Sequence, residues 1–494
     1  MNKKNPIIIG TLILTLTGFL TKIIGFFFRI FLSRSIGAEG MGIYQMVFPL
    51  FAFFHSISCA GVEVAISKYV AEEKNKSDKM SVLACGSIIS VGIAFICAIC
   101  MYFFSNEFAI YVLNEEQTAP LLKCLSYALV FSVIHSCISG YYLGQKKALI
   151  PGISSLIEQI VRTITVFAII TVLTKENASI TPIVAIYGTL AGELASSLFT
   201  FSSLRLSRIH LFKKHSKDYF SKIFSMSYPI TINSALVTLL LSVEAILIPF
   251  CLKEHGHTGT EALSIYGILT GMAIPLVMFP ASFITSMSTM VLPAVSEAAT
   301  EKENSKIKIF IENILSFCLI SGIFSTFIFI NYGNAAGFLI FGIQEVSTYI
   351  TILAWLCPFM YMSINFKSII NGLGQSKITF IHNVITNAVK IIFIVVFVPL
   401  LGIKGYLWGL LASQISICLL HYRYLSKRFN IELKPYKNII MPVILSVVAI
   451  LISRPFYVIA SKMTGHISYP AIFVPCFISL AFYILSCKLF FYNN

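Results

Sequence analysis

The sequence contains few charged residues. Only 12% of its 494 residues are Asp, Glu, Lys or Arg, whereas 57% are apolar. A soluble globular domain carries about 25% charged residues and roughly 45–50% apolar ones. A surface so poor in charge would aggregate in water, but it suits the hydrocarbon interior of a lipid bilayer. The composition therefore excludes an ordinary soluble protein.

The sequence also lacks the motifs of several enzyme classes. It has no G-x-x-x-x-G-K-[ST] loop for nucleotide phosphates, no H-E-x-x-H zinc motif and no G-x-S-x-G nucleophile motif. No cluster of His, Cys, Asp and Glu has metal-ligand spacing, and the twelve cysteines are scattered. No connection between the apolar stretches is long enough for a soluble domain. We therefore expect no enzyme activity, no catalytic residue, no resident cofactor and no metal.

What the sequence does contain is a long series of apolar stretches. Each is long enough to cross the ~30 Å hydrocarbon core of a membrane as an α-helix. This pattern predicts an all-α integral membrane protein. The fourteen expected spans are 6–33, 41–66, 81–104, 121–143, 149–173, 181–204, 223–251, 263–292, 308–330, 346–366, 378–399, 403–422, 438–458 and 469–490.

The net charge of +15 is distributed as an orientation signal. If the N-terminus is cytoplasmic, 25 Lys and Arg residues fall in cytoplasmic segments and 6 fall on the opposite side. Cytoplasmic loops of membrane proteins carry this excess of positive charge. We therefore expect a multi-pass protein of the cytoplasmic membrane with both termini in the cytoplasm. Its basic character then indicates contact with anionic lipid head groups rather than with nucleic acid. The first stretch carries Lys22 and Arg29, so we expect a membrane helix there and not a cleaved signal peptide.

Three short matches recur in the same order in the two halves of the chain. They pair Ile43-Tyr44 with Ile265-Tyr266, Leu143-Gly144-Gln145 with Leu373-Gly374-Gln375, and Gly188 and Gly192 with Gly405 and Gly409. Ordered matches indicate a duplicated unit, and six crossings per unit make the repeat parallel. We expect an N-terminal lobe at 1–204, a basic cytoplasmic linker at 205–222, a C-terminal lobe at 223–422 and an additional helix pair at 423–494.

Ionisable residues inside the expected spans are the candidates for function. Each costs at least about 2.5–3.5 kcal/mol at the centre of a membrane helix, so they are tolerated where they face a protein interior or a water-filled cavity. The candidate substrate-binding cations are Lys22, Arg29, Arg162 and Lys390. The candidate acids, which could couple transport to a cation, are Glu63, Glu158, Glu193 and Glu244.

Two pairs of these residues have informative spacing. Lys22 and Arg29 are seven residues apart, which places them on one helix face. That face either lines a cavity for an anionic group such as a diphosphate, or pairs with acids of neighbouring helices. Glu158 and Arg162 have the favourable i,i+4 order of an ion pair. This pair is either a neutralised structural element or a cavity-lining pair that changes partners during transport.

Four short segments, in two groups, resemble those of a known family. They are 20–29, Leu-Thr-Lys-Ile-Ile-Gly-Phe-Phe-Phe-Arg, with 36–45, Ile-Gly-Ala-Glu-Gly-Met-Gly-Ile-Tyr-Gln; and 143–145, Leu-Gly-Gln, leading to 158–162, Glu-Gln-Ile-Val-Arg. They are similar to the stage V sporulation protein B and polysaccharide-exporter branch of the multidrug/oligosaccharidyl-lipid/polysaccharide exporter superfamily. That superfamily also holds multidrug extruders and the lipid II flippase.

The resemblance implies two six-helix lobes around a central cavity that opens alternately to each side. In the lipid II flippase branch, cations of the first helix are thought to meet the diphosphate of the substrate, and Lys22 and Arg29 match them by position. That branch has an acid directly after the arginine, whereas this chain has Ile30. The resemblance also implies that the last two helices form a groove for a polyprenyl tail.

These observations lead to one preferred hypothesis and two alternatives. The preferred function is a flippase for an undecaprenyl-diphosphate-linked saccharide used in cell-wall, spore-cortex or polysaccharide assembly. Its partners would be this substrate, membrane lipids and cell-wall synthesis proteins, and its energy would come from the membrane potential, H⁺ or Na⁺. The alternatives are a cation-coupled multidrug antiporter of the same fold, and a non-transporting scaffold that uses the basic 205–222 segment.

Overall fold

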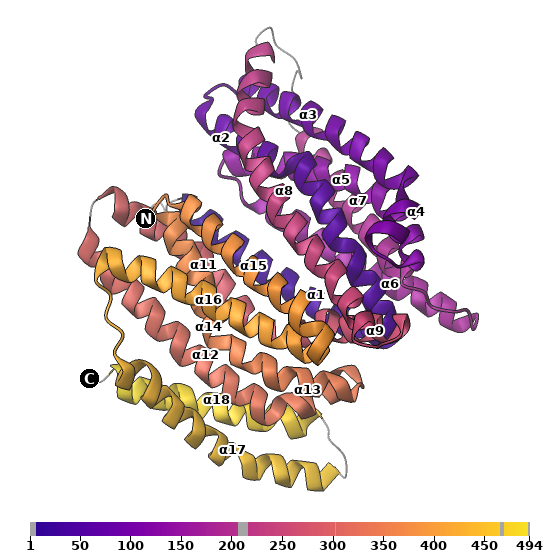
Figure 1. Ribbon diagram of the computed structural model, residues 1–494. Helices are drawn as coiled ribbons and strands as arrows, with labels where there is room; N and C mark the ends of the chain where they lie inside the picture. Colours follow the sequence, from indigo (N-terminus) through magenta and orange to yellow (C-terminus); the bar gives the residue numbers. More distant parts are fainter. Residues whose placement is uncertain (1–5, 206–215, 302, 465–468, 493–494) are drawn as a thin grey trace. The chain divides into compact units, whose positions relative to one another are not determined.

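The computed structural model describes residues 6–205, 216–301, 303–464 and 469–492 (Figure 1). Within these ranges the regular structure is entirely helical. Thirteen of the described helical segments are long and apolar enough to cross a membrane. The prediction of an all-α membrane protein is therefore confirmed.

The first of these segments contains two of the expected spans. It runs from Leu12 to Glu72 over 61 residues, which corresponds to about 90 Å of helix, roughly three times the hydrocarbon thickness. Gly37 interrupts helix α1 (Pro6–His55) with φ 72° and ψ −175°, a backbone conformation that is essentially restricted to glycine. The interruption separates the expected spans 6–33 and 41–66, so this one segment is long enough to contain two of the fourteen expected spans.

The chain forms two compact units, and the first comprises Met1–Lys253 with His257–Gly267. It contains the following elements: α1 (Pro6–His55), η1 (Ser56–Ala60), α2 (Gly61–Glu72), α3 (Lys76–Phe103), α4 (Ser105–Glu107), η2 (Phe108–Val112), η3 (Glu116–Thr118), α5 (Ala119–Gly144), α6 (Leu149–Lys175), α7 (Ile183–Arg205), α8 (Ser216–Glu254) and α9 (Gly259–Gly267). The last residue of α8, Glu254, is assigned to the second unit.

The second unit comprises Glu254–Gly256 with Ile268–Asn494. Its elements are η4 (Ile268–Ala273), α10 (Ile274–Met278), α11 (Ala281–Thr300), α12 (Asn304–Phe341), α13 (Gln344–Leu353), η5 (Ala354–Leu356), α14 (Cys357–Gly372), α15 (Ser376–Leu401), α16 (Ile403–Phe429), η6 (Tyr436–Ile440), α17 (Met441–Thr464) and α18 (Tyr469–Tyr492).

Helix α8 packs within the first unit. The Tyr69 hydroxyl donates a hydrogen bond to the carbonyl of Lys222 at 3.3 Å, and the Tyr219 hydroxyl donates one to the Glu73 carboxylate at 2.9 Å. Of the expected linker at 205–222, residues 206–215 lie outside the described residues. The lobe boundaries inferred from the sequence therefore stay a prediction.

The expected span 263–292 is not one continuous helix. The structure has α9, η4 and α10 up to Met278, then a turn at Phe279 and Pro280, and then α11. Pro280 is the N-cap residue of α11. Because proline has no backbone N–H, it suits the start of a helix and not its interior. Hydropathy alone does not detect such an interruption.

The two glycine pairs of the sequence repeat occupy equivalent places. Gly188 and Gly192 on α7 lie against α6, where a Cβ would meet the carbonyl oxygens of Arg162 and Glu158. Gly405 and Gly409 on α16 lie against α15, where a Cβ would meet the carbonyl oxygen of Phe397 and the side chain of Phe393. Small residues four apart let membrane helices approach closely. The repeated glycines therefore set the spacing of one antiparallel helix pair in each unit.

The Leu-Gly-Gln match requires a shift of two residues. The residue after the C-cap of α5 is Lys146 (φ 61°), and the residue after the C-cap of α14 is Gly374 (φ 74°). The structure thus pairs Lys146 with Gly374, whereas the sequence match paired Gly144 with Gly374. The reason is that each turn is defined by the residue with positive φ that follows the helix C-cap, and this residue is a lysine in one case and a glycine in the other.

The additional helix pair packs on α12 of the second unit (Figure 1). The Tyr483 hydroxyl of α18 donates a hydrogen bond to the carbonyl of Ile320 at 2.9 Å. Tyr483 also stacks on Phe324, with ring centroids 4.3 Å apart. On α17, Ser453 shares a hydrogen bond of 2.6 Å with Tyr332. These contacts anchor α17 and α18 through both apolar packing and polar pairs.

Candidate functional site

The expected Glu158–Arg162 ion pair is present on α6. Nη2 of Arg162 lies 2.5 Å from Oε1 of Glu158, and the two side chains are 17% and 20% exposed. The guanidinium also donates to the side-chain oxygen of Gln159 at 3.4 Å, while its Nε has no hydrogen-bond partner among the described residues. The pair is therefore mostly shielded from solvent, but one donor of the guanidinium remains unused.

Glu193 lies against this ion pair because the preceding residue, Gly192, allows α7 to approach α6 closely. A Cβ on Gly192 would lie 2.6 Å from the carbonyl oxygen of Glu158 and 3.3 Å from the Cβ of Arg162, so α7 lies directly on this turn of α6. Glu193 is only 7% exposed. Its Oε2 has no hydrogen-bond partner in the described part of the chain. A buried polar group without a partner costs about 1–3 kcal/mol, so this oxygen marks a position that could accept a proton or a cation.

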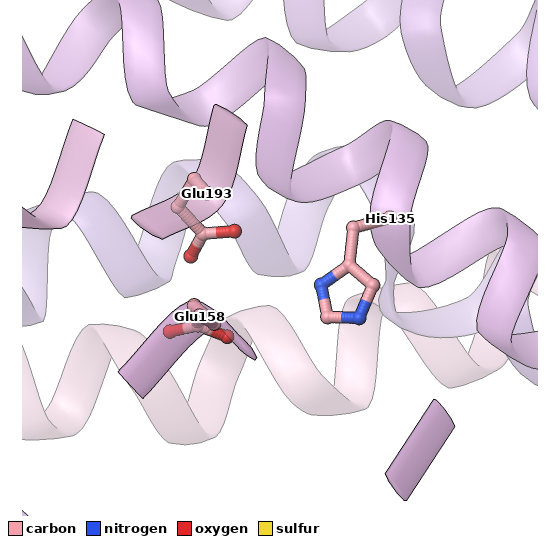
Figure 2. A group of neighbouring side chains, drawn as sticks. All are labelled: His135, Glu158 and Glu193. Atoms are coloured by element: carbon pink, nitrogen blue, oxygen red, sulfur yellow. The ribbon is translucent and has the colours of Figure 1, made fainter. Parts of the chain in front are cut away.

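A third helix brings His135 to the two glutamates. One ring nitrogen of His135 on α5, one carboxylate oxygen of Glu158 and one of Glu193 all lie within 4.8 Å of one another. Figure 2 shows the imidazole and both carboxyl groups directed into the same space. The Ser132 hydroxyl, one turn before His135, lies beside the carboxyl group of Glu193. We call His135, Glu158, Arg162 and Glu193 the polar cluster.

Helix α1 places Arg29 in the same region. The guanidinium of Arg29 is close enough to Arg162 and to the Tyr44 hydroxyl to interact electrostatically with both. One turn earlier, a Cβ on Gly25 would lie 3.4 Å from the side-chain nitrogen of Gln159 on α6. The close packing at Gly25 positions the Arg29 face of α1 beside the polar cluster. Two guanidinium groups and two carboxyl groups are thus gathered within the first unit.

The other candidate residues lie elsewhere. Lys22 has an exposed side chain two helical turns before Arg29 on α1, and Glu244 is half-buried on α8. Glu63 is half-buried on α2, close to Gly140 of α5, and no cation within the described ranges forms an ion pair with it. Lys390 is half-buried on α15 and belongs to the second unit. The structure therefore gathers Arg29, Arg162, Glu158 and Glu193, but not all eight candidates.

Sequence reasoning did not select His135. Imidazole is largely neutral at pH 7, so a search for formally charged residues in the spans passes over it. The available signal was weaker: a polar side chain in the expected span 121–143. The three potential ligands also come from three different helices, so no spacing within the sequence reveals them.

The polar cluster has the chemistry of a site for a proton or a cation. Neutral imidazole and carboxylate oxygens are ligands for both hard and intermediate cations. Arg162 already neutralises part of the negative charge through Glu158, which leaves about one negative charge, that of Glu193, for a proton or a monovalent ion. A divalent ion would have to displace the Arg162 guanidinium from Glu158. Pairing of Glu158 with that guanidinium and binding of a divalent cation at Glu158 are therefore mutually exclusive.

Comparisons with known proteins agree with this architecture. Residues 7–299 match the family model described as polysaccharide biosynthesis protein. The chain is 28% identical over 444 residues to stage V sporulation protein B of Bacillus subtilis (strain 168), covering 87% of this chain and 86% of that protein. It is 22% identical over 487 residues to the lipid II flippase MurJ of the same organism, covering 89% and 87%.

Two solved structures share the fold. The inward closed conformation of lipid II flippase MurJ matches with a TM-score of 0.74 and 16% identity, covering 98% of this chain and 99% of that one. An inward-facing multidrug resistance MATE family transporter matches with a TM-score of 0.66 and 14% identity, covering 85% and 98%. At these identities the likeness defines the fold and does not define a substrate.

Proposed function

Because the chain belongs to the polysaccharide biosynthesis protein family, we propose that it is a flippase that translocates an undecaprenyl-diphosphate-linked saccharide across the cytoplasmic membrane by alternating access. The transporter architecture is that of the MurJ and MATE proteins. The saccharide would serve cell-wall, spore-cortex or surface-polysaccharide assembly. The Lys and Arg distribution along the sequence supports an orientation with both termini in the cytoplasm.

The observation that carries the proposal is the proximity of Arg29 and Arg162 within one unit. Two guanidinium groups held together in a membrane protein repel each other unless anions offset them. The polar cluster supplies Glu158 and Glu193, of which Glu158 already pairs with Arg162. A diphosphate presents several oxygens that guanidinium groups bind in bidentate fashion. Arg29 and Arg162 therefore provide the recognition chemistry that such a head group needs.

The mechanism uses a change of partners at Arg162. In the absence of substrate, Arg162 pairs with Glu158. When the diphosphate arrives, it competes for the guanidinium, and Glu158 is left beside Glu193 and His135. Two neighbouring carboxylates repel each other in a site of low dielectric constant, so a proton or a monovalent cation binds there. Substrate binding and cation uptake would then occur together, which is the coupling that transport against a gradient requires. Lys22, on the same helix as Arg29, would attract the anionic head group from outside the cluster.

A cation-coupled multidrug antiporter is the second candidate function. The observation that favours it is the group of three potential cation ligands in the first unit. The two functions differ in which residues are essential. A flippase for an anionic lipid needs Arg29, whereas an antiporter for cationic drugs needs Glu158 and Glu193 and tolerates loss of Arg29. A non-transporting scaffold would need neither Arg29 nor the two glutamates.

The test is lipid translocation by purified protein in proteoliposomes with a fluorescent undecaprenyl-diphosphate saccharide. We expect the wild-type protein to expose protected lipid, and Arg29→Gln to lower the rate at least ten-fold. Arg34→Gln is the matched control, because it removes the same charge from an exposed position of the same helix. Wild-type rates in Arg29→Gln would refute the flippase proposal, and so would transport of a cationic dye in the absence of lipid movement.

A further inference from the structure

The second unit contains a cavity of about 330 Å³. This volume is at the small end of the range for ligand pockets, roughly 300–1,000 Å³. Its lining residues come from α10, α13, η5, α14, α15 and α16 of this unit, and it is partly open at the surface. Most of its surface is apolar, and Lys367 is the single charged residue in its lining.

Two helix faces form the long walls of the cavity. On α14 and the turn before it, Leu356, Met360 and Ile364 lead to Lys367 with spacings of three to four residues. Such spacing places side chains in one stripe, and the eleven residue-to-residue steps from the first to the last span about 17 Å. On α16, Leu410, Gln414 and Ile417 form a similar stripe. The cavity is therefore elongated along the helices, with aliphatic side chains on both walls and an ammonium group near one end.

Two histidines, one half-buried and one fully buried, lie near the charged end of the cavity. His421 is one turn beyond Ile417 on α16 and is 0% exposed. Neither of its ring nitrogens has a hydrogen-bond partner within the described ranges, and the same holds for Nδ1 of His382 on α15. The two rings lie 5.0 Å apart, and His421 is close enough to Lys367 to interact electrostatically. Asn383, next to His382, lines the cavity itself.

These groups have the composition of an anion site. Lys367 offers an ammonium, each imidazole offers an N–H donor, and Asn383 offers an amide. No carboxylate among the described residues forms an ion pair with Lys367. A positive charge within a membrane helix is costly unless an anion or water offsets it. Two unsatisfied nitrogens on a fully buried histidine add a further cost of about 1–3 kcal/mol each. An anionic ligand at this end would offset the charge of Lys367 and accept a hydrogen bond from an imidazole N–H.

We propose that this cavity binds the phosphate end of a polyprenyl carrier lipid, with the phosphate at Lys367 and Asn383, on the side of His382 and His421, and the adjoining isoprene units between α14 and α16. The proposal rests on the flippase function, and it adds a second recognition site in a different unit from Arg29. A carrier lipid has one hydrocarbon chain, which suits a narrow cavity of this volume better than the two chains of a phospholipid. A cationic ligand is disfavoured because Lys367 would repel it.

The test is photolabelling of the purified full-length chain in phosphatidylcholine nanodiscs with a diazirine-bearing farnesyl diphosphate. We expect adducts on residues that line the cavity, such as Met360, Leu410 and Ile417. We expect Lys367→Gln to lower this labelling about ten-fold, and Lys367→Arg to retain most of it. Lys377→Gln, on an exposed lysine outside the cavity, is the matched control. If Lys367→Gln does not accumulate in the membrane, Ile417→Trp, which fills the cavity, should abolish the same adducts.

Competition identifies the occupant. We expect excess undecaprenyl phosphate to displace the probe, and phosphatidylglycerol or inorganic phosphate to leave the labelling unchanged. Equal displacement by phosphatidylglycerol would overturn the assignment to a carrier lipid, and displacement by inorganic phosphate alone would overturn the role of the apolar walls. Adducts confined to other helices would overturn the site. Lipid translocation in proteoliposomes separates the two proposals: active protein without cavity labelling refutes this inference only, whereas cavity labelling without translocation refutes the flippase function only.

Discussion

Gly192 of α7 lies so close to Glu158 of α6 that a Cβ at this glycine would be 2.6 Å from the Glu158 carbonyl oxygen. The contact is to backbone, which cannot rotate away as a side chain can. It brings the next residue, Glu193, to the turn that carries Glu158 and Arg162. A single glycine therefore controls the geometry of the polar cluster.

We expect Gly192→Ala to destabilise the first unit by about 1–3 kcal/mol, because the added methyl group overpacks the α6–α7 contact. The measurement is the thermal midpoint of the detergent-solubilised protein by fluorescence-detected size exclusion. Gly92→Ala is the matched control: a Cβ there meets nothing within 4 Å, so it should be neutral or raise stability by up to about 1 kcal/mol through helix propensity. Equal midpoints for Gly192→Ala and the wild type would contradict the packing argument.

We expect the Glu158 and Arg162 substitutions to be strongly non-additive. Arg162→Gln leaves two carboxyl groups together without their closest cation, which is more damaging than removal of both partners of a shielded pair. The double variant Glu158→Gln/Arg162→Gln should therefore be more stable than Arg162→Gln alone. A double-mutant cycle on the thermal midpoint measures the coupling. Additive effects would show that the pair is not an energetic unit.

We expect Glu193→Gln to uncouple translocation from its driving ion. The amide retains the shape of the carboxyl group but cannot take up a proton or balance a cation. Downhill lipid movement should continue, while its acceleration by an imposed H⁺ or Na⁺ gradient should be lost; His135→Ala should weaken the same response. Glu261→Gln, which changes an exposed acid of α9, is the control. A gradient response that survives in Glu193→Gln would exclude this carboxyl group from coupling.

We expect Tyr332→Phe to weaken the attachment of α17 to α12. The substitution removes the 2.6 Å hydrogen bond to Ser453 and leaves a buried serine hydroxyl without that partner. The Ser453 hydroxyl still donates to the Ile450 carbonyl at 3.0 Å, so the expected cost is that of one hydrogen bond, about 0.5–1.5 kcal/mol. Tyr332→Phe/Ser453→Ala should recover part of this loss. Limited proteolysis between α16 and α17 provides the measurement, and unchanged cleavage rates would show that apolar packing alone holds the helix pair.

Much of the fold could be predicted from particular features of the sequence. The glycine pairs at Gly188 and Gly192 and at Gly405 and Gly409 predicted the repeat, and both pairs do lie at helix–helix contacts. The i,i+4 order of Glu158 and Arg162 predicted an ion pair that is present. The interruption at Pro280 was missed, because the hydropathy of 263–292 is continuous while its backbone hydrogen bonding is not. His135 was missed because it carries no formal charge.

The sequence by itself determined that this protein is a membrane protein made of helices, and approximately where each helix lies. Each apolar stretch satisfies its own backbone hydrogen bonds in lipid as a helix, so this property is local and readable in about 20 consecutive residues. Only the tertiary structure decided which polar side chains meet. The joining of Arg29, His135, Arg162 and Glu193, and the placement of Lys367 at the end of an apolar cavity, depend on how each helix is rotated about its axis. That rotation is set by close packing against neighbouring helices, at positions such as Gly25 and Gly192, and no single segment encodes it.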